Sequence, residues 1–211
     1  ILDQYRAQLN LGNTYLNQIP FSDLKAFETI FLNLPQRLHL QLANSSTVRY
    51  AQLFDIPKRV EVFCNRGTSG IDGSTATAVG AALVNQNSTL LVTGDLSFFY
   101  DINGLWNDHI PSYFRIILIN NQGGGIFRIL PGENDSPKYD TYFETIHNRN
   151  ARQISKEFNF DYRSVNNNNG LKSALKLFFN PSRGPKLLEI KTPRKINNRI
   201  LLNYFKAMQK S

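Results

Sequence analysis

The sequence predicts an α/β fold, a doubly wound and mainly parallel sheet flanked by helices. Three observations predict it: apolar, β-branched runs recur along the chain, helical segments separate them, and polar or glycine-rich segments follow the runs directly. The 211 residues, of which 41% are hydrophobic, suffice for one domain with a full core.

The N-terminal part is expected to be helical over residues 3–17 and 22–32, with Pro20 and Pro35 as helix breakers. We interpret residues 1–36 as a helical lead-in from a preceding domain and 37–211 as the sheet domain. The chain opens on Ile1 and its single methionine is Met208, so we expect a fragment of a longer protein.

The sheet domain begins with residues 38–43, which alternate between apolar and polar and predict the first strand. Asn44 and Ser45 are expected to cap a helix over 48–54. Residues 60–64 are apolar and predict the second strand, which the polar, glycine-containing loop 65–73 follows directly.

Small residues dominate segment 74–84, which predicts a helix packed closely against the sheet. The apolar runs 89–93 and 115–119 predict two buried strands, joined by a crossover helix near 98–108. Residues 131–150 form a polar stretch that contains proline and asparagine, and no helix or strand is expected there. The remaining expected elements are a helix at 152–158, a strand at 162–165, a helix at 171–179, a strand at 186–191 and a helix at 198–208.

Composition narrows the functional classes. The net charge of +8 and the pI near 9.6 leave a basic nucleic-acid-binding module as an alternative, but the positive charges are dispersed and no nucleic-acid-binding motif accompanies them. No apolar run reaches the roughly 20 residues of a membrane span, and no signal peptide is expected. Cys64 is the single cysteine and is expected to be a buried strand thiol, which favours a reducing cytoplasm.

Two motifs carry most of the chemical information, Gly94-Asp95-Leu96-Ser97 and the segment 120–125. Asp95 and Asn121 directly follow the two apolar strands, and their separation of 26 residues is the length of one βαβ unit. On neighbouring strands the two side chains would lie about 5 Å apart at the ligand-binding edge of the sheet. Carboxylate and amide oxygens suit Mg²⁺ holding a diphosphate, whereas the alternative is an ordinary glycine-rich turn.

These motifs resemble a known family. A Gly-Asp pair followed about 25 residues later by Asn-Asn resembles the pattern of the thiamine-diphosphate-dependent enzymes. The strings CNRGTSGIDG, GDLSFFYDINGLW and NNQGGGIFRILP resemble in particular the 2-succinyl-5-enolpyruvyl-6-hydroxy-3-cyclohexene-1-carboxylate (SEPHCHC) synthases of menaquinone biosynthesis. The resemblance is densest over 44–131 and covers only the cofactor-diphosphate-binding domain. Leu96 stands where many enzymes using this cofactor have glycine, which argues against a generic acetolactate synthase or decarboxylase.

The resemblance implies a set of site residues. The side chains of Asp95 and Asn121 and the carbonyl of Gly123 would bind Mg²⁺ or Mn²⁺. Ile71 would be the apolar wedge under the cofactor, with an ordinary loop hydrophobe as the alternative. The implied cofactor-binding residues are Gly70, Ile71, Gly94, Asp95, Leu96, Ser97 and Asn121. The implied substrate-binding residues are Ser45, Arg49, Arg66, Ile126 and Phe127, although singly the arginines are also typical of surface ion pairs.

The resemblance also implies an activity, a transferase (carboligase) reaction. The whole enzyme would decarboxylate 2-oxoglutarate and add the succinyl-semialdehyde carbanion equivalent to isochorismate. Its activating glutamate would lie on a separate N-terminal pyrimidine-binding domain, so we expect no catalytic residue here and no activity from the fragment alone. The full-length protein is expected to form a homodimer or homotetramer. Another thiamine-diphosphate-dependent decarboxylase or carboligase remains an alternative. His39, His109 and His147 are expected to be structural or surface residues.

Overall fold

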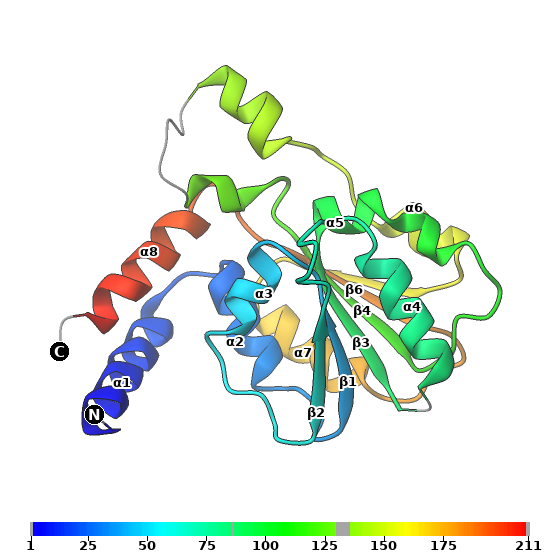
Figure 1. Cartoon of the computed structure of the whole chain (residues 1–211), viewed down its shortest axis with the longest axis horizontal. Coiled ribbons are helices and arrows are strands. Elements are labelled where there is room, and N and C mark those ends of the chain that lie inside the picture. Colours follow the sequence, from blue (N-terminus) through cyan, green and yellow to red (C-terminus); the bar gives the residue numbers. More distant parts are fainter. Residues whose placement is uncertain (1, 86, 130–135, 210–211) are drawn as a thin grey trace.

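The computed structural model of the chain contains one six-stranded sheet between two layers of helices (Figure 1), and it describes residues 2–85, 87–129 and 136–209. All five strand pairs are parallel, in the order β2-β1-β3-β4-β6-β5, which confirms the predicted fold class. The strands are β1 Leu38–Leu42, β2 Val60–Cys64, β3 Thr89–Gly94, β4 Phe114–Asn120, β5 Asp161–Val165 and β6 Lys186–Lys191.

The helices follow the strands in the alternating manner that the sequence indicates. The α-helices are α1 Leu2–Gln18, α2 Asp23–Phe31, α3 Ser46–Ala51, α4 Ser74–Val84, α5 Asp95–Tyr100, α6 Arg152–Glu157, α7 Asn168–Phe178 and α8 Asn197–Met208. Shorter turns of other helix types are η1 Ile102–Leu105, η2 Gly125–Arg128 and η3 Tyr139–Glu144.

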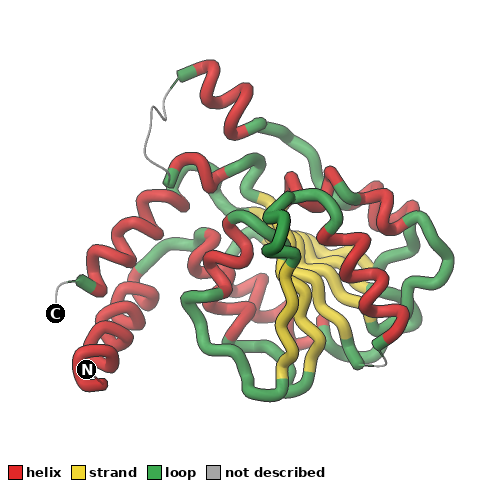
Figure 2. Tube along the Cα trace, viewed as in Figure 1, coloured by secondary structure: helices red, strands yellow, loops and turns green. Residues whose placement is uncertain are grey.

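The two faces of the sheet bury different residues of the same strands, because successive side chains point to opposite faces. Leu90 and Val92 of β3 pack into one core with α2, α3, α7 and α8. Leu91 packs into the other core, with α4, α5 and η1. Figure 2 shows the strands enclosed between these helical layers. The continuous apolar runs that predict buried strands therefore serve two cores at once.

The N-terminal helices are tied to the sheet domain. Leu24, Phe27 and Ile30 of α2 are at most 1% exposed and belong to the main core. On α1, the hydroxyl of Tyr15 donates to the carbonyl of Ile200 on α8, and these two helices lie side by side at one side of the molecule (Figure 1). The assignment of residues 1–36 to a preceding domain remains a prediction.

Three local predictions are wrong. The crossover helix begins at Asp95 instead of 98, because the Asp95 carboxylate accepts the N–H of Leu96 and starts α5 at the strand end. Ser45 does not cap α3 through its side chain, and the amide of Asn44 instead donates to the loop carbonyls of Asn65 and Gly70. The polar stretch expected to be a loop contains the π-helical turn η3. The part of the expected stretch at 131–135 lies outside the described residues.

The thiol of Cys64 is half-buried and donates to the side-chain oxygen of Asn44, and burial raises the pKa of this thiol.

Among the residues that the structure describes, none of the helices combines the length and the apolar character that a membrane crossing requires.

His39 on β1 gives the fold a pH dependence. Its ring stacks on Phe63, and Nε2 accepts a hydrogen bond from Gln41, so the buried ring is neutral. Burial lowers the pKa of His39 below its ordinary value of 6.5, against a smaller opposing effect of the Glu61 carboxylate. A histidine with a lowered folded pKa stabilises the fold above the unfolded pKa, and this contribution is lost as the pH falls through the folded pKa.

We therefore expect the urea midpoint to fall between roughly pH 7 and pH 5, and to fall less in His39→Gln, which has no group to titrate there. An equal fall in both proteins would show that His39 does not carry this dependence.

Candidate functional site

A cavity of about 150 Å³ lies at the carboxyl edge of the sheet, where β1, β3 and β4 end. Most of the predicted site residues line it: Ser45, Ile71, Gly94, Asp95, Leu96, Ser97, Asn121, Gly123, Ile126 and Phe127. Gly70, Arg49 and Arg66 do not line it. Asp23, Phe27, Asn44 and Tyr50 also line the cavity, although no site role was expected for them.

Asp95 is the carboxylate at the centre of the site. β3 and β4 are paired neighbours, with Gly94 opposite Ile119, so Asp95 and Asn121 follow adjacent strand ends as the spacing predicts. Asp95 is 3% exposed. Its Oδ1 accepts the N–H of Leu96 at 2.7 Å, and its Oδ2 accepts the N–H of Gly123 at 3.1 Å. One carboxylate therefore joins the start of α5 to the glycine loop.

His147 lies against the same carboxylate, with Nε2 3.2 Å from Asp95 Oδ2. Its Nδ1 accepts the N–H of Arg149 at 3.1 Å. The ring edge also meets Phe99, with centroids 5.4 Å apart. We expected a structural or surface residue, whereas the structure brings this histidine to the candidate metal site. Its position in a polar segment without periodicity gave no signal of this contact.

Asn121 is held by a residue that the sequence did not indicate. Its Nδ2 donates to Oδ2 of Asp23 at 2.8 Å, across 98 positions of sequence. Asp23 is 3% exposed, and burial raises its pKa to about 6, although hydrogen bonds from Thr192 and Asn121 lower it. An acidic residue in the first turn of a helix is common, so nothing in the pattern separates Asp23 from an ordinary surface carboxylate.

The glycine loop has a shape that only glycine permits at one position. Gly123 has a φ of +155°, and a Cβ there would lie 2.7 Å from the carbonyl oxygen of Glu144. The N–H of Gly124 donates to that same carbonyl at 2.6 Å. The carbonyl of Gly123, which we expect to face a cation, accepts the N–H of Gly125 at 3.0 Å and has a second lone pair left.

Glu144 anchors this loop through a buried ion network. Its side chain is fully buried and pairs with Arg128, whose Nε lies 2.9 Å away, and with Arg194 at 2.8 Å. Arg128 also contacts Asp140 at 3.0 Å. The network joins η2, η3 and the segment after β6, so it holds η3 against the glycine loop.

The predicted wedge is fixed from two sides. The hydroxyl of Ser97 donates to the carbonyl of Ile71, and the amide of Asn44 donates to the carbonyl of Gly70 at 2.6 Å. Ser97 was expected among the cofactor-binding residues, and in this structure its hydroxyl holds the wedge loop. Gly70 does not line the cavity, but its carbonyl accepts from Asn44, which does.

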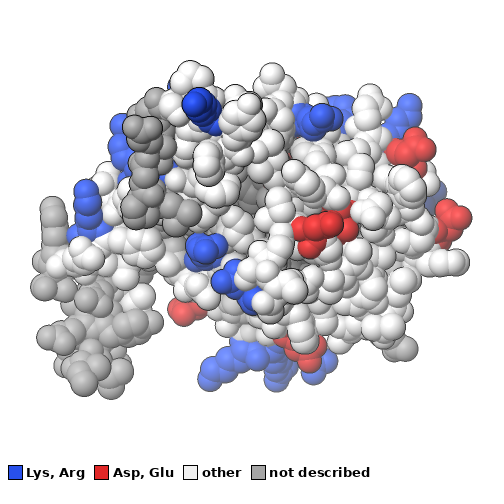
Figure 3. All heavy atoms as spheres, turned by 45° about the horizontal axis from the view of Figure 1, so that its top comes forward, with Lys and Arg blue, Asp and Glu red and all other residues white. Residues whose placement is uncertain are grey.

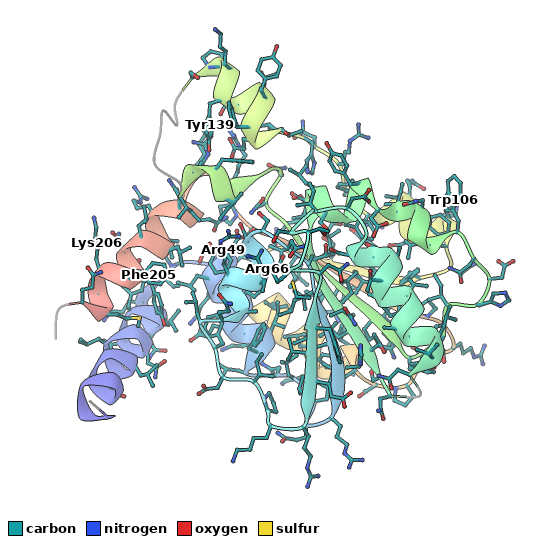
Figure 4. The ribbon with its side chains drawn as sticks, viewed as in Figure 1. Arg49, Arg66, Trp106, Tyr139, Phe205 and Lys206 are labelled. Atoms are coloured by element: carbon teal, nitrogen blue, oxygen red, sulfur yellow. The ribbon has the colours of Figure 1, made fainter. Side chains whose placement is uncertain are left out.

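Arg49 and Arg66 lie outside the cavity and are exposed. The guanidinium of Arg49 donates to the carbonyl of Ser45, a cavity residue, at 2.9 Å. Figure 4 shows both arginines near α3, at the carboxyl edge of the sheet. In Figure 3, which turns this edge forward, basic side chains lie in the middle of the face.

The donor set fits a hard divalent cation. Asp95, Asn121 and the Gly123 carbonyl supply only oxygen ligands, which Mg²⁺ and Mn²⁺ prefer. Within the described ranges, no group of three or more His, Cys, Asp or Glu side chains could hold a metal by itself. A cation here would therefore need further oxygens from a ligand, as a diphosphate supplies them.

Comparison with known proteins agrees with this geometry. Residues 44–190 match the family described as "Thiamine pyrophosphate enzyme, C-terminal TPP binding domain". The chain is similar to proteins named 2-succinyl-5-enolpyruvyl-6-hydroxy-3-cyclohexene-1-carboxylate synthase from three bacteria. It is 53% identical to that of Christiangramia forsetii over 92% of this chain and 34% of that protein. It is 55% identical to that of Flavobacterium psychrophilum over 93% of this chain and 36% of that protein. It is 42% identical to that of Bacteroides fragilis over 91% of this chain and 35% of that protein. The chain thus spans about a third of the length of these relatives.

Proposed function

Because the chain belongs to the thiamine pyrophosphate enzymes, as their C-terminal TPP-binding domain, we propose that it is the cofactor-diphosphate-binding part of a SEPHCHC synthase. The synthase would decarboxylate 2-oxoglutarate and join the resulting four-carbon unit to isochorismate, a transferase reaction in menaquinone biosynthesis. The observation that carries the proposal is the convergence of Asp95, Asn121 and Gly123 in one cavity of a chain more than half identical to such synthases.

The chain's own residues would bind the cofactor and the metal. Asp95, Asn121 and the Gly123 carbonyl would hold Mg²⁺ or Mn²⁺, which offsets the charge of the diphosphate in a partly buried cleft. Gly94, Leu96 and Ser97 line the same cavity and would supply donors to the diphosphate. When bound, thiamine diphosphate supplies the electron sink for cleaving and forming carbon–carbon bonds. Ile71, fixed by Ser97, would press against the cofactor's apolar face.

The substrate side of the site would be basic at its rim and apolar within. Ile126 and Phe127 line the cavity next to the glycine loop, and Ser45 lines it next to α3. Arg49 and Arg66 would bind carboxylates of 2-oxoglutarate and isochorismate at the edge of the cavity, where arginine offers paired donors.

The remaining functions would belong to the rest of the synthase. We propose that an N-terminal pyrimidine-binding domain supplies the activating glutamate, that the full-length protein is a cytoplasmic homodimer or homotetramer, and that this chain alone has no turnover. The basic charge would serve anionic cofactor and substrates rather than nucleic acid or a membrane.

Arg49→Ala and Arg66→Ala are expected to raise KM for the carboxylate substrates while leaving the affinity for thiamine diphosphate unchanged. Losing one charge-assisted contact costs about 1.5–3 kcal/mol, or roughly ten- to a hundredfold. Steady-state kinetics of the full-length synthase measures the effect, with the exposed Arg59→Ala at the opposite edge of the sheet as control. If KM stays constant and cofactor affinity drops, these arginines serve the diphosphate instead.

The function itself is tested by incubating the full-length synthase with isochorismate and either 2-oxoglutarate or pyruvate, in the presence of thiamine diphosphate and Mg²⁺. We expect SEPHCHC to form in the incubation with 2-oxoglutarate and isochorismate, and no product to form in the incubation with pyruvate. Turnover of pyruvate, and none of 2-oxoglutarate, would assign a different reaction within the same family.

A further inference from the structure

We propose that Asp23 is a positioning residue of the cation site, which turns the carboxamide of Asn121 so that its oxygen faces the metal. This inference rests on the proposed function, because it concerns how Asn121 becomes a metal ligand. Asp23 lies in the segment expected to be a lead-in, and the proposal gives this segment a part in the site.

The chemistry of the amide makes such a partner necessary. The oxygen and nitrogen of a carboxamide are similar in size, but only the oxygen can ligate a cation and only the nitrogen can donate. A carboxylate can only accept, so Asp23 selects the nitrogen of Asn121, which lies 2.8 Å from Asp23 Oδ2. The flipped amide would set an oxygen against the carboxylate, so the pair leaves Oδ1 for the metal.

Asp23 is itself held in place by two other elements. The hydroxyl of Thr192, just after β6, donates to Asp23 Oδ1 at 2.5 Å. The backbone N–H of Asp23 donates to the side-chain oxygen of Asn197, at the start of α8, at 2.9 Å. All three residues are at most 7% exposed, and hydrogen bonds are stronger in such a dry environment. The orientation of Asn121 is therefore set by a rigid partner.

Asp23 and Asp95 both line the same cavity, the one at the carboxyl edge of the sheet. The buried carboxylate of Asp95 is unfavourable without a compensating positive charge, and among the residues that the structure describes no lysine or arginine lines this cavity. A divalent cation held by Asp95 and Asn121 would supply that charge to Asp95, whereas Asp23 is compensated by its hydrogen bonds from Thr192 and Asn121. A purely structural role for Asp23 would not require a place on the cavity wall.

The test is Mn²⁺ binding to the full-length synthase with thiamine diphosphate present, measured by electron paramagnetic resonance. For Asp23→Ala we expect Mn²⁺ affinity to fall about tenfold or more, which corresponds to the loss of one hydrogen bond to a charged group. We also expect a changed hyperfine pattern. Asp23→Asn should stay close to wild type, since its oxygen still accepts from Asn121 and the Thr192 hydroxyl can turn to accept from the new amide.

The matched control is Thr29→Val. Thr29 is a buried residue of the same helix, and its hydroxyl donates to the side chain of Asn168, far from Asn121. It should lower stability without changing Mn²⁺ affinity. If Asp23→Ala does not fold, Thr192→Val decides, because it loosens Asp23 without touching Asn121 and should weaken Mn²⁺ binding.

Each outcome has one meaning. Wild-type affinity in Asp23→Ala, or in Thr192→Val if that variant has to decide, would overturn the proposal. Equal losses in Asp23→Asn and Asp23→Ala would also overturn it, because charge rather than orientation would then be responsible. Absence of Mn²⁺ binding in the wild-type synthase would instead contradict the proposed function.

Discussion

Asp95→Ala in the full-length synthase is expected to abolish Mg²⁺-dependent binding of thiamine diphosphate, with affinity lower by about a hundredfold or more, or roughly 3 kcal/mol. The variant removes a charged ligand and also the acceptor that joins Leu96 to Gly123. Asn121→Ala should also lower the affinity for thiamine diphosphate, because it removes the second side-chain oxygen that would bind the metal. Calorimetric titration with thiamine diphosphate, with and without Mg²⁺, measures both variants.

The control for this experiment is Asp101→Asn. Asp101 is equally buried, at 2% exposure, and its carboxylate accepts the N–H of Ala76 outside the cavity. It should bind the cofactor as the wild type does. Unchanged affinity in both Asp95→Ala and Asn121→Ala would refute the metal assignment.

Glu144→Ala is expected to lower the free energy of unfolding by about 3–5 kcal/mol, because it leaves two arginines without their shared buried partner. The side chains of Arg128 and Arg194 are only 10% and 19% exposed, and that of Glu144 is fully buried. The variant should also weaken cofactor binding, since η3 then no longer holds the backbone of Gly124.

Asp140→Ala provides the matched comparison. Asp140 also pairs with Arg128, but its side chain is 43% exposed, and such exposed pairs contribute about 0–1 kcal/mol. Urea unfolding of the 211-residue chain compares the two variants. Equal and small losses would mean that the Glu144 network does not stabilise the loop.

The strands and the central pair of site residues could be predicted from sequence because their signals are local. The apolar runs ending at Gly94 and Asn120 are continuous, as strands buried on both faces require. Asp95 and Asn121 are the residues that come directly after those two strand ends. The start of α5 was missed because the helix begins at the strand end itself, where the Asp95 carboxylate accepts the N–H of Leu96.

The residues that sequence reasoning missed act over long separations. Asp23 reaches Asn121 from a helix 98 positions earlier. His147 reaches Asp95 from a polar segment, and η3 owes its place to Glu144 among distant arginines. No periodicity or spacing records such contacts, since each depends on how separate elements pack.

The most direct test of the proposed site is the coordination of the metal itself. Mn²⁺ and thiamine diphosphate bound to the full-length synthase would be studied by ³¹P electron–nuclear double resonance, which detects phosphorus one bond beyond a coordinating oxygen. Direct coordination predicts a clear phosphorus coupling in the wild type and in the Asp101→Asn control, and its loss in Asp95→Ala. A bound Mn²⁺ without phosphorus coupling, or a coupling unchanged in Asp95→Ala, would contradict a cation that joins these strand ends to the cofactor.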